Sequence, residues 1–176
     1  MFTPEVERLL NEQVVAEYYS ANLYLSMSAW LDDHNYNGYA NWYYIQYKEE
    51  TDHALIFYNY IRNAGGVVKL GGIEAPQVEF SGIREILALT LEHEQQVTSR
   101  IYNIVAQAQT DHDFKTIQFL DWFIKEQVEE ESNANSNLGR FDNFGDDAKA
   151  LLSLDQEMST RVYTQTAQLA LYENGA

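Results

Sequence analysis

A chain of 176 residues in which 45% of the side chains are hydrophobic can bury one sizeable core, so we expect a single domain over residues 1–176. The 27 acidic residues against 11 basic ones give a formal net charge of -16, which disfavours nucleic acid and anionic membranes as partners. The sequence has no cysteine for thiolate sites and no apolar run of the roughly 20 residues that a membrane helix needs, so a cytoplasmic protein that binds metals through oxygen and imidazole is expected.

Four long helices are predicted from their start and stop signals. Pro4 directly after Thr3 is typical of a helix start, and the pair Gly65-Gly66 is typical of a helix stop. Ser81 is a candidate cap for the third helix. The predicted helices span about residues 4–31, 36–64, 82–109 and 113–141.

The connections between these helices predict their topology. Residues 32–35 and 110–112 are short connections, which force antiparallel neighbours. Residues 65–81 can reach roughly 55 Å when extended, whereas a helix of about 28 residues is only about 42 Å long. The second and third helices can therefore run parallel, and the prediction is an all-α up-down-down-up four-helix bundle with a long crossover.

A shorter amphipathic helix is predicted after the bundle, over about residues 146–172. Its apolar stripe would consist of Leu151, Leu152, Met158 and Val162. The fold class is therefore completed by a short fifth helix at the C-terminus.

Each of the four long helices carries polar residues on the stripe that should face the core. In the second helix, spacings of four and three residues put Glu50 at a core position, one turn before His53. A lone histidine at core spacing is more often a hydrogen-bonded core residue than a ligand. His53 is a candidate metal ligand only because core glutamates accompany it. The other interrupted stripe positions are Glu17, Glu94, Gln127 and Glu130.

These interruptions share one depth in the bundle. One position from each helix falls about 12 to 14 residues after the predicted helix start, namely Glu17, Glu50, Glu94 and Gln127, and a difference of two residues is only about 3 Å along a helix axis. An isolated buried carboxylate costs several kcal/mol, and none of the 11 basic residues falls on these stripes within a turn of the glutamates. A cation is the simplest neutraliser, and carboxylates with one imidazole suit iron or manganese.

The motifs now described strongly resemble those of bacterial non-haem ferritins. The resemblance covers nearly the whole chain and rests on Glu17, Tyr24, Glu50-Thr51-Asp52-His53, Glu94 and the run from Glu126 to Glu130. It implies an iron storage protein that oxidises ferrous iron with oxygen or peroxide and keeps the ferric mineral inside a shell of twenty-four subunits. A fifth helix packed around an axis of that shell would bury apolar residues that a monomer exposes.

The same resemblance implies a di-iron ferroxidase centre within one subunit. One iron would be held by Glu17, Glu50 and His53. The other would be held by Glu50, Glu94 and Glu130, so Glu50 would bridge the two ions.

Further roles follow from the resemblance alone. Gln127 would lie beside the second iron, and Tyr24 would act next to the pair as a redox or hydrogen-bonding residue. Glu49, Glu126 and Glu129 would form a third iron site with Glu130. Acidic residues off the core stripes are usually a solvated helix face, and that interpretation of these three stays open from the residues alone.

One related class fits the chain less well, and two other functions stay open. Bacterioferritins carry Glu-x-x-His on the fourth helix and a haem-binding methionine where this chain has Asp52, so haem is not expected. A di-metal carboxylate oxidase acting on an organic substrate would need an apolar pocket beside the metals. A non-catalytic helical scaffold would have no use for unmatched carboxylates in its core.

Overall fold

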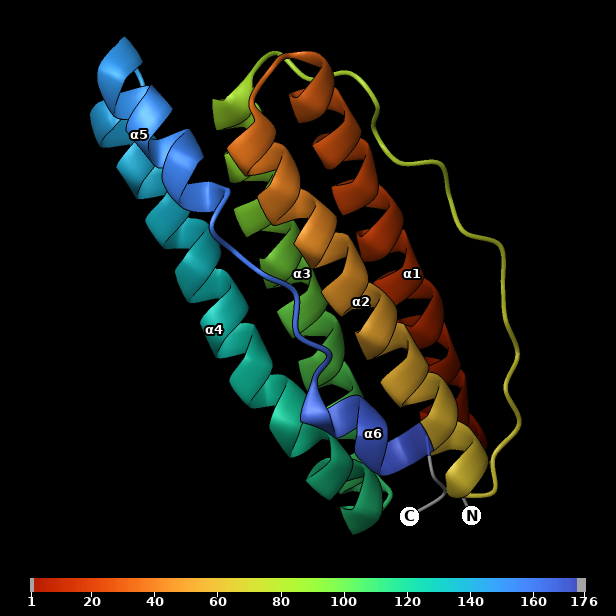
Figure 1. Ribbon diagram of the computed structural model, residues 1–176. Helices are drawn as coiled ribbons and strands as arrows, with labels where there is room; N and C mark the ends of the chain where they lie inside the picture. The colour runs from red at the N-terminus through yellow and green to blue at the C-terminus, as the bar shows by residue number, and fades with distance from the viewer. Residues whose placement is uncertain (1, 174–176) are drawn as a thin grey trace.

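The computed structural model describes residues 2–173, and every regular element within that range is an α-helix (Figure 1). The four long helices begin and end within about three residues of the predicted positions, which is the usual uncertainty of helix ends. The helices are α1 (Pro4–Asp33), α2 (Asn37–Asn63), α3 (Ile83–Thr110), α4 (Phe114–Phe144), α5 (Ala148–Met158) and α6 (Ala167–Glu173).

Side-chain caps fix the starts of α1 and α4. The Thr3 hydroxyl accepts a hydrogen bond from the Val6 amide, and Pro4 occupies the first turn, where no amide hydrogen is needed. The Asp113 carboxylate accepts from the Thr116 amide in the same way. Both predicted helix starts are therefore confirmed.

The long crossover begins at a glycine stop and ends beside a serine. Gly65 has a φ of 81°, and the Gly66 amide donates to the Ile61 carbonyl at 2.8 Å, which closes the end of α2. At the other end, the N-cap of α3 is Gly82 and not Ser81. Ser81 instead donates from its amide and hydroxyl to the Glu85 carboxylate.

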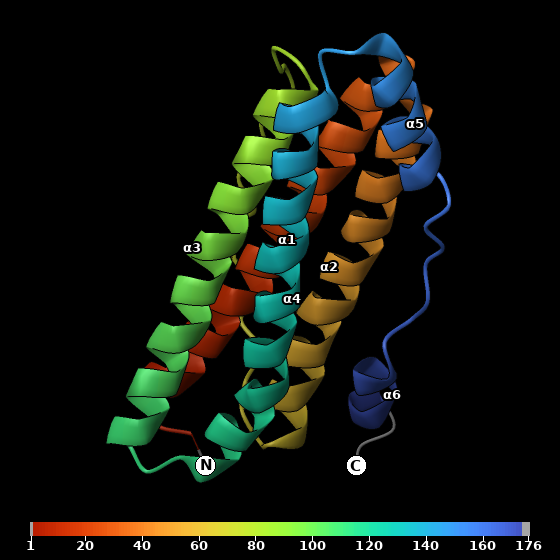
Figure 2. The same cartoon turned by 90° about the vertical axis from the view of Figure 1, so that its left-hand side faces the viewer.

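The bundle has the predicted topology. α1 and α2 are antiparallel, as are α3 and α4, and the crossover runs the length of the bundle so that α2 and α3 point the same way (Figures 1 and 2). Among the described residues, no helix is both long and apolar enough to cross a membrane.

The apolar core is divided into two clusters along the bundle axis. One cluster contains Leu10, Phe57 and Ile101, together with other residues from the end where α1 begins. The other contains Met27, Tyr43 and other residues from the opposite end. Between them lies the polar layer, which we define as the buried side chains of Glu17, Glu50, His53, Glu94, Gln127 and Glu130.

The predicted helix over residues 146–172 is wrong as a single element. α5 ends at Met158, residues 159–166 are not helical, and α6 begins at Ala167. The alternation of β-branched residues from Thr160 to Thr166 disfavours helix, and this local preference explains the break. We call residues 159–173 the C-terminal tail.

The predicted apolar stripe of that helix is wrong at Val162, which lies between α5 and α6 and is 81% exposed. Leu152, on α5, is 58% exposed in the single chain, which agrees with the expectation that only assembly would bury it. Met158 is buried as predicted, but within the chain itself and together with Leu154. The burial that was expected from subunit assembly is therefore supplied partly by the bundle.

Helix α5 is held against the start of α2 by the Asp155 side chain, which caps backbone amides in the first turn of α2. The Asp155 carboxylate accepts from the amides of Gly38 and Tyr39 at 2.9 and 3.0 Å. A Cβ at position 38 would lie 1.6 Å from the Asp155 carbonyl oxygen, so only glycine permits this approach. The contact sets the place from which the C-terminal tail starts.

Candidate metal centre

Three ligand-type side chains of the polar layer meet within one small region. The side chains of Glu17 on α1, and of Glu50 and His53 on α2, are buried and place ligand atoms within 4.8 Å of one another. His53 Nδ1 lies 3.4 Å from the Glu50 carboxylate. Among residues 2–173, no other group of three carboxylate or imidazole side chains meets this closely. We call these three residues the first subsite.

One oxygen of the first subsite has no partner. Glu17 is 1% exposed, and its Oε2 accepts no hydrogen bond from any described group. Its Oε1 accepts from the Gln13 amide at 2.8 Å, which orients the carboxylate. A buried, unpaired carboxylate oxygen is unfavourable, and it fits a place where a cation binds.

The charge of the first subsite is not balanced by protein cations. Burial and the neighbouring Glu50 carboxylate raise the pKa of Glu17 well above its usual range. Burial, with the charges of Glu94 and Glu130, does the same to the pKa of Glu50. No described lysine or arginine forms an ion pair with the polar layer. The cluster must therefore take up protons or a metal cation.

The His53 ring is fixed by aromatic neighbours on α4. It meets Trp122 edge-on at 5.5 Å and Phe123 at 5.8 Å between ring centroids. These contacts hold the ring while its Nδ1 lies 3.4 Å from the Glu50 carboxylate. An imidazole held in a fixed orientation is a good ligand for a transition metal.

The other half of the polar layer is closed by hydrogen bonds. The Glu94 carboxylate accepts from the Tyr24 hydroxyl and, at 3.1 Å, from the Gln127 amide. Glu130 accepts from the Gln46 amide at 3.1 Å. Burial and the Glu94 charge raise the pKa of Glu130 to about 8. We call Glu94, Gln127 and Glu130 the second subsite.

The predicted outer residues lie at the edge of this arrangement. Glu49 and Glu126 are half-buried, whereas Glu129 is exposed. Like charge connects them, because Glu126 raises the pKa of Glu49 and Glu129 raises that of Glu126, in each case behind the larger effect of burial. We call these three residues the outer trio.

Sequence reasoning missed three residues around these sites. Gln13 and Gln46 each lie four residues before a predicted ligand on the same helix, a spacing that puts them on one face and could have signalled their role. Arg161 lies far along the chain yet forms an ion pair with Glu49 at 2.6 Å. Because Glu49 lies off the core stripes, this pair leaves intact the expectation that no basic residue pairs with the core glutamates among the described residues.

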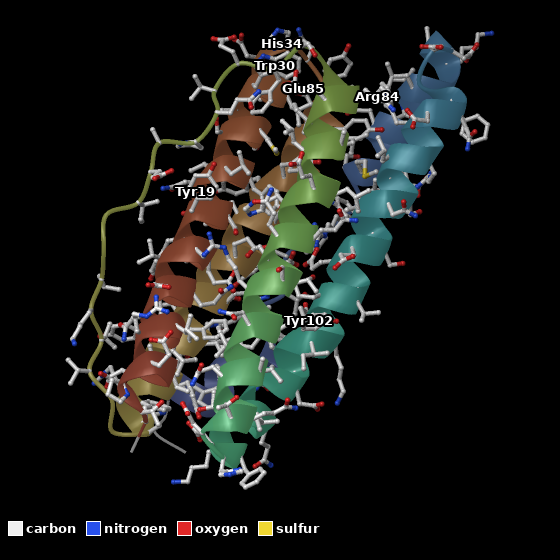
Figure 3. All side chains as sticks on the ribbon, turned by 180° about the vertical axis from the view of Figure 1, so that it is seen from behind. Tyr19, Trp30, His34, Arg84, Glu85 and Tyr102 are labelled. Carbon is white, nitrogen blue, oxygen red and sulfur yellow. The ribbon has the colours of Figure 1, made fainter. Side chains whose placement is uncertain are left out.

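The remaining histidines lie outside the polar layer. His93 shares a hydrogen bond of 2.8 Å with Ser20, and burial lowers its pKa to about 4, so it stays neutral at pH 7. His34 stacks on Trp30 at the end of α1 (Figure 3). Neither joins the ligand group found among the described residues.

Comparison with known proteins places this geometry in a family. A family model described as a ferritin-like domain matches residues 7–144. The chain is 40% identical to a bacterial non-heme ferritin of Staphylococcus epidermidis over 165 residues, covering 94% of this chain and 99% of that protein. It is 38% identical to a bacterial non-heme ferritin of Staphylococcus aureus, again over 165 residues that cover 94% of this chain and 99% of that protein.

Solved structures agree with the sequence comparison. An engineered closed form of the Archaeoglobus fulgidus ferritin matches with a TM-score of 0.91 and 39% identity over 93% of this chain and 100% of that one. The open-pore ferritin of the same archaeon matches with a TM-score of 0.90 and 38% identity over 92% of this chain and 99% of that one. With its polar layer inside an up-down-down-up bundle and near full-length similarity to these proteins, the chain belongs to the ferritin family.

Proposed function

We propose that the chain is an iron storage ferritin that oxidises ferrous iron at a di-iron centre in the polar layer. The observation that carries the proposal is the first subsite, where a buried carboxylate oxygen of Glu17 has no partner and lies in reach of Glu50 and His53. Removing a charge cluster of this kind from water is costly unless a cation binds. Iron is here the substrate, not a permanent cofactor.

The ligand types suit ferrous oxidation. Hard carboxylate oxygens favour ferric over ferrous iron, and each ion gives up one electron, so a pair delivers two electrons to oxygen or peroxide together. The first subsite offers one imidazole, whereas the second subsite offers only oxygen ligands. We expect iron at the second subsite to bind more weakly and to leave more readily.

Glu50 is the residue best suited to bridge two ions. It belongs to the first subsite, and its carboxylate also feels the charges of Glu94 and Glu130. Tyr24 and Gln127 both donate to Glu94, so they would hold that carboxylate in place until the second ion binds. The outer trio would then receive iron as a third site on its way to the mineral.

Storage requires an assembly larger than one chain. The relatives are named non-heme ferritins, and the solved relatives are an open-pore ferritin and an engineered closed form of it. We propose that this chain forms a homo-oligomeric shell of twenty-four subunits without haem. A reducing cytoplasm, where iron is kept ferrous, suits this role.

An oxidase acting on an organic substrate is less well supported. A pocket of about 700 Å³ lies between α1, α3 and the crossover, and one of about 430 Å³ lies between α3 and α4. Neither pocket is lined by Glu17, Glu50 or His53, and Gln127 is the one residue of the polar layer that lines the smaller pocket. An organic substrate held in either pocket would therefore lie outside the first subsite.

Size-exclusion chromatography with iron analysis tests the proposed function. Protein loaded aerobically with ferrous iron is expected to elute as a large iron-rich particle. Glu50→Ala protein should elute at the same size with slow loading, while Glu92→Ala, which removes an exposed glutamate of α3, should load normally. Elution as a 20.3 kDa monomer, or a shell that takes up no iron, would contradict the proposal.

A further inference from the structure

The C-terminal tail runs along α2 in the same direction as the helix (Figure 1). Asn41 donates to the Arg161 carbonyl near the start of α2, and Asn63 donates to the Tyr172 carbonyl near its end. Between these points, Tyr163 donates to the buried Asp52 carboxylate at 2.7 Å. The tail is thus fixed at several points over the helix that carries Glu50 and His53.

Arg161 is the one strong charge that the tail brings to this helix face. Its guanidinium donates to the Glu49 carboxylate at 2.6 Å and to the Gln46 carbonyl oxygen at 2.5 Å, and it lies 4.0 Å from the Trp42 ring centroid. The side chain of Arg161 is only 20% exposed. Three contacts at spacings of four and three residues show that the guanidinium is seated on one face of α2.

The contact with Gln46 connects the tail to the second subsite. Gln46 accepts from Arg161 through its carbonyl oxygen and donates through its amide nitrogen to Glu130 at 3.1 Å. A glutamine held at both ends cannot turn without breaking one of these bonds. The position of Arg161 therefore influences a carboxylate of the second subsite as well as one of the outer trio.

We propose that Arg161 is an internal counter-ion and positioning residue for the iron path: it neutralises Glu49 until a metal cation arrives at the outer trio and displaces it. The proposal rests on the proposed function, because it takes the outer trio to be a place where iron passes. A cation and the guanidinium compete for the same carboxylate. Displacing Arg161 also frees Gln46, so occupation of the outer trio loosens the hold on Glu130.

Competition between the guanidinium and a cation predicts the direction in which the cation affinity changes when Arg161 is replaced. Removing the guanidinium should strengthen cation binding at the outer trio, because the cation no longer has to break an ion pair. The expected gain is about fivefold, the scale of a partly exposed ion pair. Lysine at the same position keeps the charge but loses the double contact, so Arg161→Lys should fall between the parent and Arg161→Gln.

Titration calorimetry with Zn²⁺, which is not oxidised, measures the binding directly. Zn²⁺ binding at the outer trio is identified as the binding event that Glu126→Gln weakens. In Arg161→Gln, this event should tighten about fivefold. The matched control is Arg84→Gln, which removes the same charge from an exposed ion pair with Asp142 at the start of α3 and should leave the binding event unchanged (Figure 3).

Tryptophan emission reports the displacement itself. Zn²⁺ binding at the outer trio should change the emission of Trp42 in the parent, because the guanidinium leaves its ring. The change should be absent in Arg161→Gln and in Trp42→Phe, and present in Tyr163→Phe, which loosens the tail without touching Arg161.

The proposal would be overturned, while the proposed function stands, if the Zn²⁺ affinity of the outer trio were unchanged in Arg161→Gln. It would also be overturned if Trp42 emission in the parent did not change when Zn²⁺ binds. Outer binding that weakens in Arg161→Gln would also overturn it, because Arg161 would then support the site. If Zn²⁺ shows no event that His53→Ala weakens, the proposed function fails and this proposal fails with it.

Discussion

The two halves of the polar layer both contain two buried glutamates, but their hydrogen bonding differs. In the first subsite, a Glu17 oxygen has no partner, and Glu50 and His53 lie within ligand distance of it. In the second subsite, Glu94 and Glu130 are already hydrogen-bonded to neutral side chains. A cation at the first subsite would satisfy an unpaired oxygen, whereas a cation at the second subsite would have to replace existing hydrogen bonds.

This difference implies an order of binding. A cation entering the first subsite satisfies an orphaned oxygen and meets a nitrogen ligand. A cation entering the second subsite must replace donors such as Tyr24, Gln127 and Gln46. Protons are displaced at both subsites, because the pKa values of Glu17, Glu50 and Glu130 are all raised. Binding should therefore be sequential, with the first subsite filled before the second.

The largest effect is expected from Glu50→Ala, which breaks both halves together. Fast ferrous oxidation should fall by at least about 100-fold, because both ions lose a ligand. Apo protein should be at least as thermally stable as the parent, since one member of a cluster of buried like charges is gone. Stopped-flow oxidation and apo melting temperature measure the two effects. Rapid two-electron oxidation in the variant would rule out bridging, and a large loss of apo stability would make Glu50 a structural residue.

A second prediction separates the halves. His53→Ala should weaken the first Zn²⁺ equivalent by about 10- to 100-fold, and Glu94→Ala should weaken mainly the second equivalent by a similar factor. Calorimetry on the two variants gives both affinities. If both variants lost the same Zn²⁺ equivalent, the two subsites would act as one site, and the contrast between them would be contradicted.

The sequence predicts the polar layer itself but not the contrast within it. Helical spacing is enough to put Glu17, Glu50 and Glu94 at core positions and at one depth. Which carboxylate is hydrogen-bonded depends on donors from other helices and on side-chain rotamers. Tyr24 meeting Glu94 across two helices is a result of packing that spacing along one helix does not contain.

The tail shows a different limit of sequence reasoning. Apolar residues near helical spacing suggested one helix over 146–172, but local preference ended it at Met158. Arg161 could not be assigned to the metal centre because its partner Glu49 lies 112 positions away in the sequence. Long-range ion pairs of this kind leave no periodic signal.

A third prediction concerns the pH dependence of apo stability. The pKa of Glu130 is raised to about 8 in the folded protein from its ordinary value of 4.5. Stability from the protonated group is complete below about pH 4.5 and is lost as pH rises to about 8. The apo melting temperature should therefore fall by at least about 2 °C between pH 6 and 9. Calorimetry of Glu130→Gln should show a shallower fall, and an identical slope would contradict the assignment.

The smallest effect is expected at the outer trio. Replacing Glu49, Glu126 and Glu129 with alanine should leave the first two-iron oxidation unchanged and slow later turnovers by about threefold, because the charge that draws iron away from the second subsite is lost. The iron-to-oxygen ratio should change as well. Multi-turnover oxidation with an oxygen electrode measures both, and unchanged kinetics would leave the trio as a solvated helix face.

Anaerobic titration of the apo protein with ferrous iron tests the central contrast most directly. The account predicts two binding events per subunit at the polar layer, with the first at least about tenfold tighter than the second because only the first subsite has an orphaned oxygen and an imidazole. Any third event should be weaker and should depend on the outer trio. Two equal and independent events, or a single event at the polar layer, would contradict the account.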